Sequence, residues 1–317
     1  MNPLLPAALG LVLALSLASC ASGGLSRKEE GRLYYSLGQA YDELGRFSDA
    51  AAAYERAFQS DRSLFSAGYN LVRIHLAAGR VSQGKALLQE FLALDPDNTV
   101  LLEAAAWAEY LDGDGEAALG IYRRILELKP QDSTALYNIS RIYLQREDHG
   151  PAVEALRALT QAPELAPGIP ERAFLLCETA FLETLRGNDG AARDILLALD
   201  SQSLSPPVKL RVFELLGDIY SRQELFTEAL GAYDQIADSD PPPAEILYKK
   251  AVIYLTAIDD SEGGLALLSR ALEAGFDREE AFRELLARSD LGDPRGVRAL
   301  LREKGLEPSA GVSEPPA

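Results

Sequence analysis

The residue types that most often carry chemistry are scarce and far apart in this sequence. Two cysteines, Cys20 and Cys177, and two histidines, His75 and His149, occur among 317 residues. The sequence has no His-x3-His pair, no cysteine cluster and no Gly-x-Ser-x-Gly elbow, so the spacings of common zinc sites and hydrolases are missing. We therefore predict no catalytic residue, no metal site and no cofactor.

Two short segments imitate ligand-binding loops. Gly79-x4-Gly84-Lys85 has the spacing of a phosphate-binding loop, but Ala86 stands where Mg²⁺ binding needs Ser or Thr. The acidic and glycine-rich segment 112–116 lacks the distal acid pattern of an EF-hand loop. Both segments fall where the chain is expected to turn between helices, and a structural turn is the interpretation that we favour.

Cys20 ends the stretch Leu17-Ala18-Ser19-Cys20, which follows an uncharged apolar run over residues 4–18. The run is shorter than the ~20 residues of a membrane-spanning helix and has the length of a signal-peptide core. The stretch resembles the lipobox of bacterial lipoproteins, in which a peptidase cuts before a cysteine that becomes acylated. This resemblance implies a signal peptide over 1–19, lipidation at Cys20 and a flexible tether over 20–30. An ordinary secretory cleavage site and an uncleaved anchor are the alternatives.

The residues after the cysteine bear on location. Ala21 and Ser22 follow it, in place of the Asp that retains enterobacterial lipoproteins at the inner membrane. By resemblance, this favours a protein that is anchored by lipid in the bacterial cell envelope, at the outer membrane and facing the periplasm. With Cys20 acylated, Cys177 has no partner for a disulfide, and its apolar neighbours predict a buried structural thiol.

The net charge of −17 limits the partners of the chain. Residues 159–317 hold 28 acids against 16 Lys and Arg, whereas residues 1–158 hold 20 against 15. This balance argues against nucleic acid and against a chain that lies flat on anionic lipid. Solubility alone and a basic partner for the acidic second half are both compatible with it.

A period of 34 residues runs through the body of the chain. Two prolines, Pro96 and Pro130, close successive units. The period also appears in four sets of residues that are spaced by 34: Gly45, Gly79, Gly113 and Glu147; Ala50, Gly84, Ala118 and Ala152; Leu37, Leu71, Ala105 and Ile139; and Tyr41, His75, Glu109 and Tyr143. The glycines suit a left-handed turn after a first helix, and the alanines suit close contact between two helices. We expect Tyr41, Tyr54, Tyr122 and Tyr143 to fill the layer between hairpins.

The period and its residues resemble the tetratricopeptide repeat (TPR), a helical hairpin with Leu-Gly-x2-Tyr on its first helix and Ala-x3-aromatic on its second. Leu37-Gly38-x2-Tyr41 with Ala50-x3-Tyr54 matches this signature, as do Leu216-Gly217-x2-Tyr220 and Ala229-x3-Tyr233. The resemblance implies an all-α, right-handed superhelical solenoid of about seven hairpins plus capping helices over 31–290. Residues 291–317 should form a short terminal helix and a disordered tail.

In TPR proteins the first helices line a concave face, and register maps ten candidate partner-binding residues onto it. These are Tyr69, Asn70, Arg73, Trp107, Tyr110, Tyr137, Asn138, Arg141, Phe174 and Phe181. Glu103 and Cys177 map to the same face. Asn could hold the backbone of an extended peptide, Arg could meet a carboxylate, and the aromatics could anchor side chains. Packing within the solenoid is the alternative role for the same residues.

The expected function is a non-catalytic scaffold for protein–protein interactions. Its partners would be an envelope protein or peptide segment on the concave face and a membrane through the N-terminal lipid, but no nucleic acid. The alternative is a periplasmic small-ligand-binding TPR protein that serves a transporter. A pocket closed by aromatic side chains would favour this alternative, and an open groove would favour a peptide.

Overall fold

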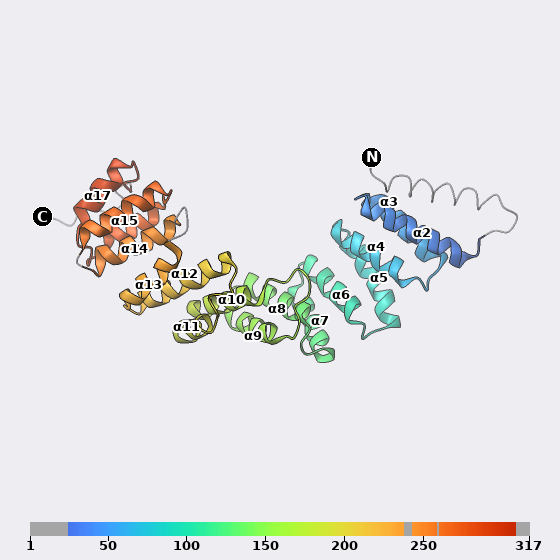
Figure 1. Ribbon diagram of the computed structural model, residues 1–317. Coiled ribbons are helices and arrows are strands. Elements are labelled where there is room, and N and C mark those ends of the chain that lie inside the picture. Colours follow the sequence, from blue (N-terminus) through green and yellow to red (C-terminus); the bar gives the residue numbers. More distant parts are fainter. Residues whose placement is uncertain (1–24, 238–242, 259, 309–317) are drawn as a thin grey trace. The chain divides into compact units, whose positions relative to one another are not determined.

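The computed structural model describes residues 25–237, 243–258 and 260–308, and the described chain is built of sixteen helices without a strand (Figure 1). In chain order they are α2 (Arg27–Glu43), α3 (Phe47–Ser60), α4 (Phe65–Ala77), α5 (Val81–Leu94), α6 (Thr99–Leu111), α7 (Gly115–Leu128), α8 (Ser133–Gln145), α9 (His149–Gln161), α10 (Arg172–Leu185), α11 (Asp189–Leu197), α12 (Pro206–Arg222), α13 (Phe226–Ala237), α14 (Ala244–Thr256), α15 (Ser261–Glu273), α16 (Glu279–Ala287) and α17 (Pro294–Glu303). The predicted signal peptide, Cys20 and the chain end from residue 309 lie outside the described residues.

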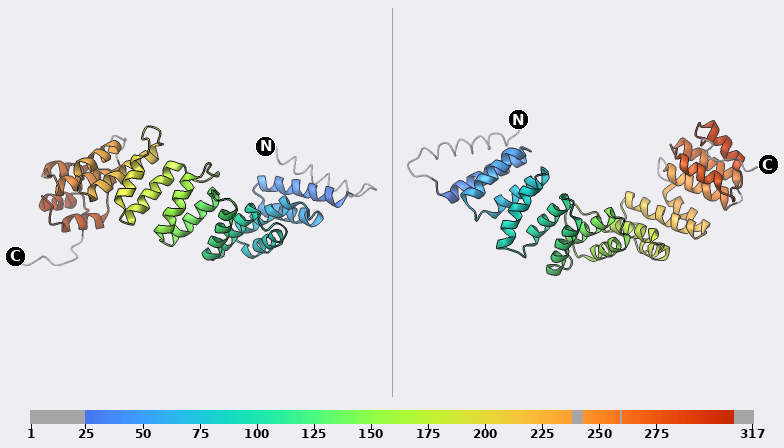
Figure 2. Two further views of the ribbon diagram at one scale, coloured as in Figure 1. Left: turned by 90° about the horizontal axis from the view of Figure 1, so that it is seen from below. Right: turned by 180° about the vertical axis from the view of Figure 1, so that it is seen from behind.

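Helices α2 to α15 follow one another in the order of TPR helices, and consecutive helices pair as α2 with α3, α4 with α5, α6 with α7, α10 with α11, α12 with α13 and α14 with α15. Helices α16 and α17 follow them, and the predicted all-α TPR solenoid is confirmed. The chain divides into two compact units, each described here by itself. The first unit holds α2 to α8 and residues 161–169, and the second holds residues 149–160 and the chain from residue 170 on. Within each unit, paired helices such as α2 and α3 or α14 and α15 lie side by side (Figures 1 and 2).

The turns inside the pairs explain the first repeat column. Gly45, Gly79 and Gly113 have φ angles of 70°, 70° and 89°, in the left-handed region that glycine enters without a Cβ penalty. Glu147 occupies the same slot with a φ of 58°, and Glu224 does so in a later pair with a φ of 59°. The repeat therefore imposes its backbone even where the sequence offers a less suitable residue.

The core is made of small residues that face aromatic rings. The alanines predicted as contacts within hairpins, Ala50, Ala118, Ala152 and Ala229, are all fully buried. A glycine on the first helix makes room for the ring that follows: a Cβ on Gly38 would lie 2.6 Å from the ring of Tyr54. Tyr54, Tyr122 and Tyr233 are 1–2% exposed. Close helix packing thus depends on residues with little or no side chain.

Two of the tyrosines differ from expectation. Tyr54 and Tyr122 are buried as predicted, but Tyr41 and Tyr143 are only partly buried. The guanidinium of Arg46 lies 4.7 Å above the Tyr41 ring, and Arg123 donates to the Tyr143 hydroxyl at 2.7 Å. The repeat column on the first helix therefore reaches the surface, whereas the aromatic column on the second helix lies in the core.

The ends of the described chain show why the helices begin and stop where they do. Ser26 and Glu29 form a capping box at α2, so this helix begins at Arg27, inside the segment predicted as tether. At the other end, the predicted short terminal helix is α17, which Asp293 caps and which has Pro294 at its first position. No helix in residues 25–308 combines the length and the apolar character that a bilayer span requires.

A buried carboxylate in the second unit joins α9 to α10. Glu183 is 1% exposed and accepts hydrogen bonds from Arg186 at 3.0 Å, from Asn188 at 2.7 Å and from Arg157. Three donors compensate the loss of hydration of this charge.

Candidate functional site

A groove of about 460 Å³ lies in the first unit between α4, α6 and α8. Its walls come mainly from the first helices of three successive repeats, because residues 34 apart occupy the same place in each repeat. Its lining consists of Tyr69, Val72, Arg73, Leu76, Ala77, Glu103, Ala104, Trp107, Tyr122, Thr134 and Asn138. This is the face on which register had placed the candidate residues.

The groove gathers some of the predicted residues and leaves others apart. Tyr69, Arg73, Trp107 and Asn138 line it together, and Tyr110 and Arg141 line a small adjoining recess that Trp107 and Asn138 share. Asn70 and Tyr137 border neither space. Phe174 and Phe181 belong to the second unit, where Phe174 is 39% exposed and Phe181 lies 4.9 Å below the guanidinium of Arg211.

Ala104 lines the groove with a small side chain. It stands in register with Asn70 and Asn138, so the middle repeat lacks the side chain that its two neighbours carry. Apolar groups of Val72 and Leu76 border the space that this leaves. Alanine carries no chemistry that would mark position 104 as a candidate, although alignment of the three repeats shows an Asn–Ala–Asn column there.

The aromatic wall of the groove is held in place from behind. The Trp107 ring stacks on Tyr110, with centroids 5.3 Å apart and planes 24° from parallel. The Tyr110 hydroxyl donates to Oε1 of Gln145 at 2.7 Å. Trp107 nevertheless remains 38% exposed. It therefore both packs within the solenoid and presents a ring to the groove.

The charges of the groove are not equivalent. The guanidinium of Arg73 forms an ion pair with Asp42, which neutralises it within the protein. Glu103 has no hydrogen-bond or ion-pair partner among the described residues, and it is only partly exposed. Burial raises the pKa of its carboxyl above the ordinary value, and Asp132 adds to this while Lys129 opposes it. Burial, followed by Glu103, also raises the pKa of Tyr69.

Asn138 is partly committed to its own helix. Its amide nitrogen donates to the carbonyl oxygen of Thr134 at 2.9 Å. This bond fixes the carboxamide and leaves its oxygen free to accept a hydrogen bond from a ligand. This oxygen can therefore still accept a hydrogen bond from the backbone of a peptide, which is the role predicted for Asn138.

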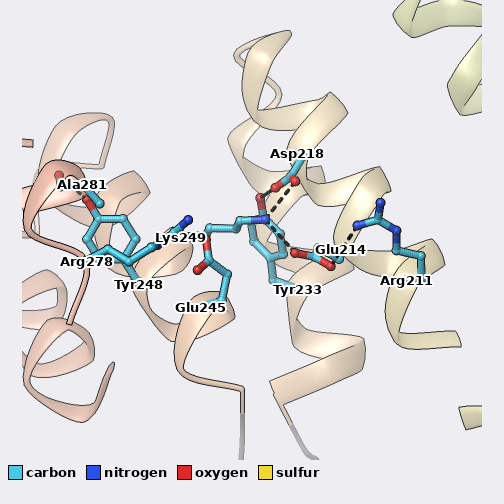
Figure 3. Close-up of polar contacts among 9 residues, drawn as sticks. All are labelled: Arg211, Glu214, Asp218, Tyr233, Glu245, Tyr248, Lys249, Arg278 and Ala281. Carbon is cyan, nitrogen blue, oxygen red and sulfur yellow. Dashed lines mark hydrogen bonds and ion pairs between the residues drawn. The ribbon is translucent and has the colours of Figure 1, made fainter. Parts of the chain in front are cut away.

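The second unit has a cavity of its own, about 760 Å³, between α12, α14 and α16. Figure 3 shows that its central cation is already satisfied: the Lys249 ammonium lies 2.9 Å from both Glu214 and Asp218. Burial lowers the pKa of Lys249, but these two carboxylates outweigh it and the net pKa is raised. The Tyr233 hydroxyl donates to Asp218 at 2.6 Å.

The same view shows how α14 is joined to the next helices. Arg278 pairs with Glu245, and the Tyr248 hydroxyl donates to the carbonyl oxygen of Ala281 at 2.8 Å (Figure 3). The rings of Tyr248 and Phe276 stack with centroids 4.1 Å apart. Each cation drawn in this view thus has an internal carboxylate, so these ion pairs hold helices together rather than offering a free cation.

The remaining candidates have structural roles. Cys177 is fully buried, and burial raises its pKa to about 11, so the predicted buried thiol is confirmed and its assignment to the concave surface is wrong. Lys85 pairs with Glu109 and Asp112 at 2.8 and 2.9 Å, and Gly84 lies in α5 against Leu76. In the described part of the chain, no group of three or more His, Cys, Asp or Glu side chains could hold a metal ion.

Known proteins support the repeat assignment. Tetratricopeptide repeat family models match residues 31–64, 69–133, 104–167 and 214–277, more than half of the chain. The C-terminal part of a TPR protein from Cytophaga hutchinsonii has the same fold, with a TM-score of 0.61, 14% identity and coverage of 76% of this chain and 93% of that one.

Two curated relatives are similar over part of their length. An uncharacterized lipoprotein of Treponema pallidum is 25% identical over 39% of this chain and 63% of its own. The peroxisomal targeting signal receptor of Komagataella phaffii is 29% identical over 43% of this chain but only 24% of its own. The chain thus spans less than two thirds of either relative. The matched models, the 34-residue period and the helix pairs together establish that this chain belongs to the tetratricopeptide repeat family.

Proposed function

We propose that this chain is a non-catalytic docking scaffold of a bacterial envelope, anchored by lipid at Cys20, which holds an extended peptide segment of an envelope protein in the groove of its first unit. As a TPR protein it is a scaffold for protein–protein interactions. The observation that carries the proposal is the groove between α4, α6 and α8, with an exposed Trp107 ring and the acceptor oxygen of Asn138.

The anchor rests on different observations. Leu17-Ala18-Ser19-Cys20 has the pattern of a lipobox, and one relative that covers part of this chain is a lipoprotein. Two or three acyl chains hold a protein stably at a membrane, since each buried CH₂ contributes about 0.8 kcal/mol. We place the protein at the outer membrane, facing the periplasm, on the residues that follow Cys20.

Lipidation is tested by expressing the chain and its Cys20→Ser variant in a bacterium fed labelled palmitate. We expect label and an intact mass that begins at acylated Cys20 for the parent chain, and an unprocessed, unlabelled Cys20→Ser variant. A mature N-terminus at another residue without acyl groups would exclude the anchor.

Docking is tested by pull-down from solubilised membranes followed by an array of overlapping synthetic peptides from each captured protein. Trp107→Ala and Asn138→Ala should lose peptide capture, whereas Arg56→Ala and Arg123→Ala, on exposed surfaces outside the groove, should keep it. Loss only with the Arg pair would move the partner to another surface. Capture of a small solute instead of a peptide would favour the alternative, a ligand-binding protein that serves a transporter.

A further inference from the structure

We propose that the space beside Ala104 receives the side chain of a lysine or arginine from the bound segment, so that the groove selects basic peptides. This inference rests on the proposed docking function and names the chemistry of the partner. The lining of the groove has a mixed character. Part of it is apolar, and among the described residues it carries a single charge without a partner, that of Glu103.

The base fits the aliphatic part of a long basic side chain. Val72, Leu76 and Ala104 present carbon, and the exposed Trp107 ring borders the same space. Lys and Arg commonly lay their methylene stems on such surfaces while the charged end seeks a polar partner. An indole ring also attracts a cation that approaches its face.

The rim supplies the polar partner. Glu103 is the one groove-lining charge without a partner in the described part of the chain, because Arg73 is neutralised by Asp42. An apolar ligand would bury this carboxylate further without compensation, which is costly. A cation would compensate it with a charge-assisted hydrogen bond, and the raised pKa of Glu103 agrees with a carboxyl that lacks such a bond.

The other nearby cations do not pair with Glu103. Lys129 lowers the pKa of Glu103 through its charge, but its ammonium donates to Oγ1 of Thr99 at 2.7 Å. Arg141 lines the adjoining recess rather than the groove, and its guanidinium lies 5.8 Å from the centroid of the Tyr137 ring. The net charge of −17 would further raise the encounter rate with basic partners.

The single tryptophan provides the assay, since Trp107 is the only one in the sequence and lines the groove. The full-length chain in mild detergent is titrated with synthetic pentapeptide libraries that fix the central residue as Lys, Arg, norleucine, Gln or Glu. Indole fluorescence reports occupancy. Because a charge-assisted hydrogen bond to Glu103 is available only to a cation, we expect the Lys and Arg libraries to bind at least about tenfold more tightly than the norleucine library, whose side chain has a similar stem but no charge.

Two variants test the assignment of the groups. Glu103→Gln should reduce the preference for Lys and Arg to within about twofold, while Glu127→Gln, an exposed acid on α7, should leave it unchanged. Ala104→Asn restores the residue of the neighbouring repeats and should abolish binding by filling the space. Circular dichroism should show that each variant keeps the helical content of the parent chain. Binding is compared below the unfolding transition of each variant, because Ala104 packs against the core of the first unit and Asn is a weaker helix former than Ala.

The outcomes separate this inference from the docking proposal. Equal binding of all libraries that is still lost in Ala104→Asn would overturn the basic preference and keep peptide docking. No fluorescence response to any library would overturn both. Binding of free arginine or cadaverine as tight as that of the peptides would replace a peptide partner with a small cation.

Discussion

Gly217 in α12 offers a sharp test of how the hairpins pack. A Cβ at this position would lie 2.2 Å from Cε1 of Tyr233, where real Cβ atoms are essentially never found. The ring cannot easily move away, because Tyr233 is 1% exposed and its hydroxyl donates to Asp218 at 2.6 Å. Gly231, on the partner helix α13, is exposed and has nothing within 4 Å of an added Cβ.

The same substitution should therefore have opposite effects at the two positions. Gly→Ala inside a helix stabilises it by about 1 kcal/mol, and this gain applies to both. Overpacking a core costs about 1–3 kcal/mol, and the 2.2 Å approach places Gly217→Ala at the upper end. We expect Gly217→Ala to lower the free energy of unfolding by about 2 kcal/mol and Gly231→Ala to raise it by about 1 kcal/mol.

Thermal unfolding followed by circular dichroism measures the difference. With about 2–4 °C per kcal/mol for a unit of this size, the two variants should differ by roughly 6–12 °C in the transition of the second unit. Tyr233→Leu should recover much of the loss in a double variant with Gly217→Ala, because the clash is with the ring. Equal shifts for the two single variants would refute the close contact between α12 and α13 on which the core rests.

Further expectations follow from single groups. Glu147→Gly should raise the free energy of unfolding by up to about 1 kcal/mol, since glycine avoids the left-handed penalty at a φ of 58°, and urea unfolding would detect it. Lys249→Met should lower it by about 1–3 kcal/mol in the same assay, because Glu214 and Asp218 lose their partner. In a Cys20→Ser background, Cys177 should resist thiol reagents at pH 8 until urea is added, since burial raises its pKa to about 11; rapid native labelling would contradict this. Burial, followed by Asp42, raises the pKa of Tyr54 from 10.0 to about 12, so its contribution to stability is full below pH 10 and lost as pH rises toward 12; Tyr54→Phe should flatten this alkaline limb.

The sequence was sufficient for the features that depend on the repeat alone. The turn at Gly45, the buried Ala118 and the cap of α17 by Asp293 each follow from a local backbone or packing demand that recurs every repeat or at a helix end. The same register placed Trp107 beside Asn138. These residues could be predicted because spacing along the chain converts directly into position on a helix face.

The rest depends on neighbours that spacing does not identify. Cys177 shares a helix with Phe174 but points into the core, and the charge of Arg73 is neutralised by Asp42 from another helix. The buried Glu183 gave no signal, because its donors come partly from a different hairpin. The space beside Ala104 is bordered by residues from other helices, such as Val72 and Asn138, so the sequence around Ala104 does not reveal it.

The repeat fold and the proposed function of the groove place different demands on position 104. An Asn here is what the adjacent repeats carry at Asn70 and Asn138, so this helix position accepts Asn at only a modest cost in helix propensity. Consensus design of the repeat would even introduce it, because averaging over repeats erases the one that differs. Engineering this chain for robustness therefore risks silencing its groove, whereas varying residues 103 and 104 offers a way to redirect it to a different cargo on an unchanged frame.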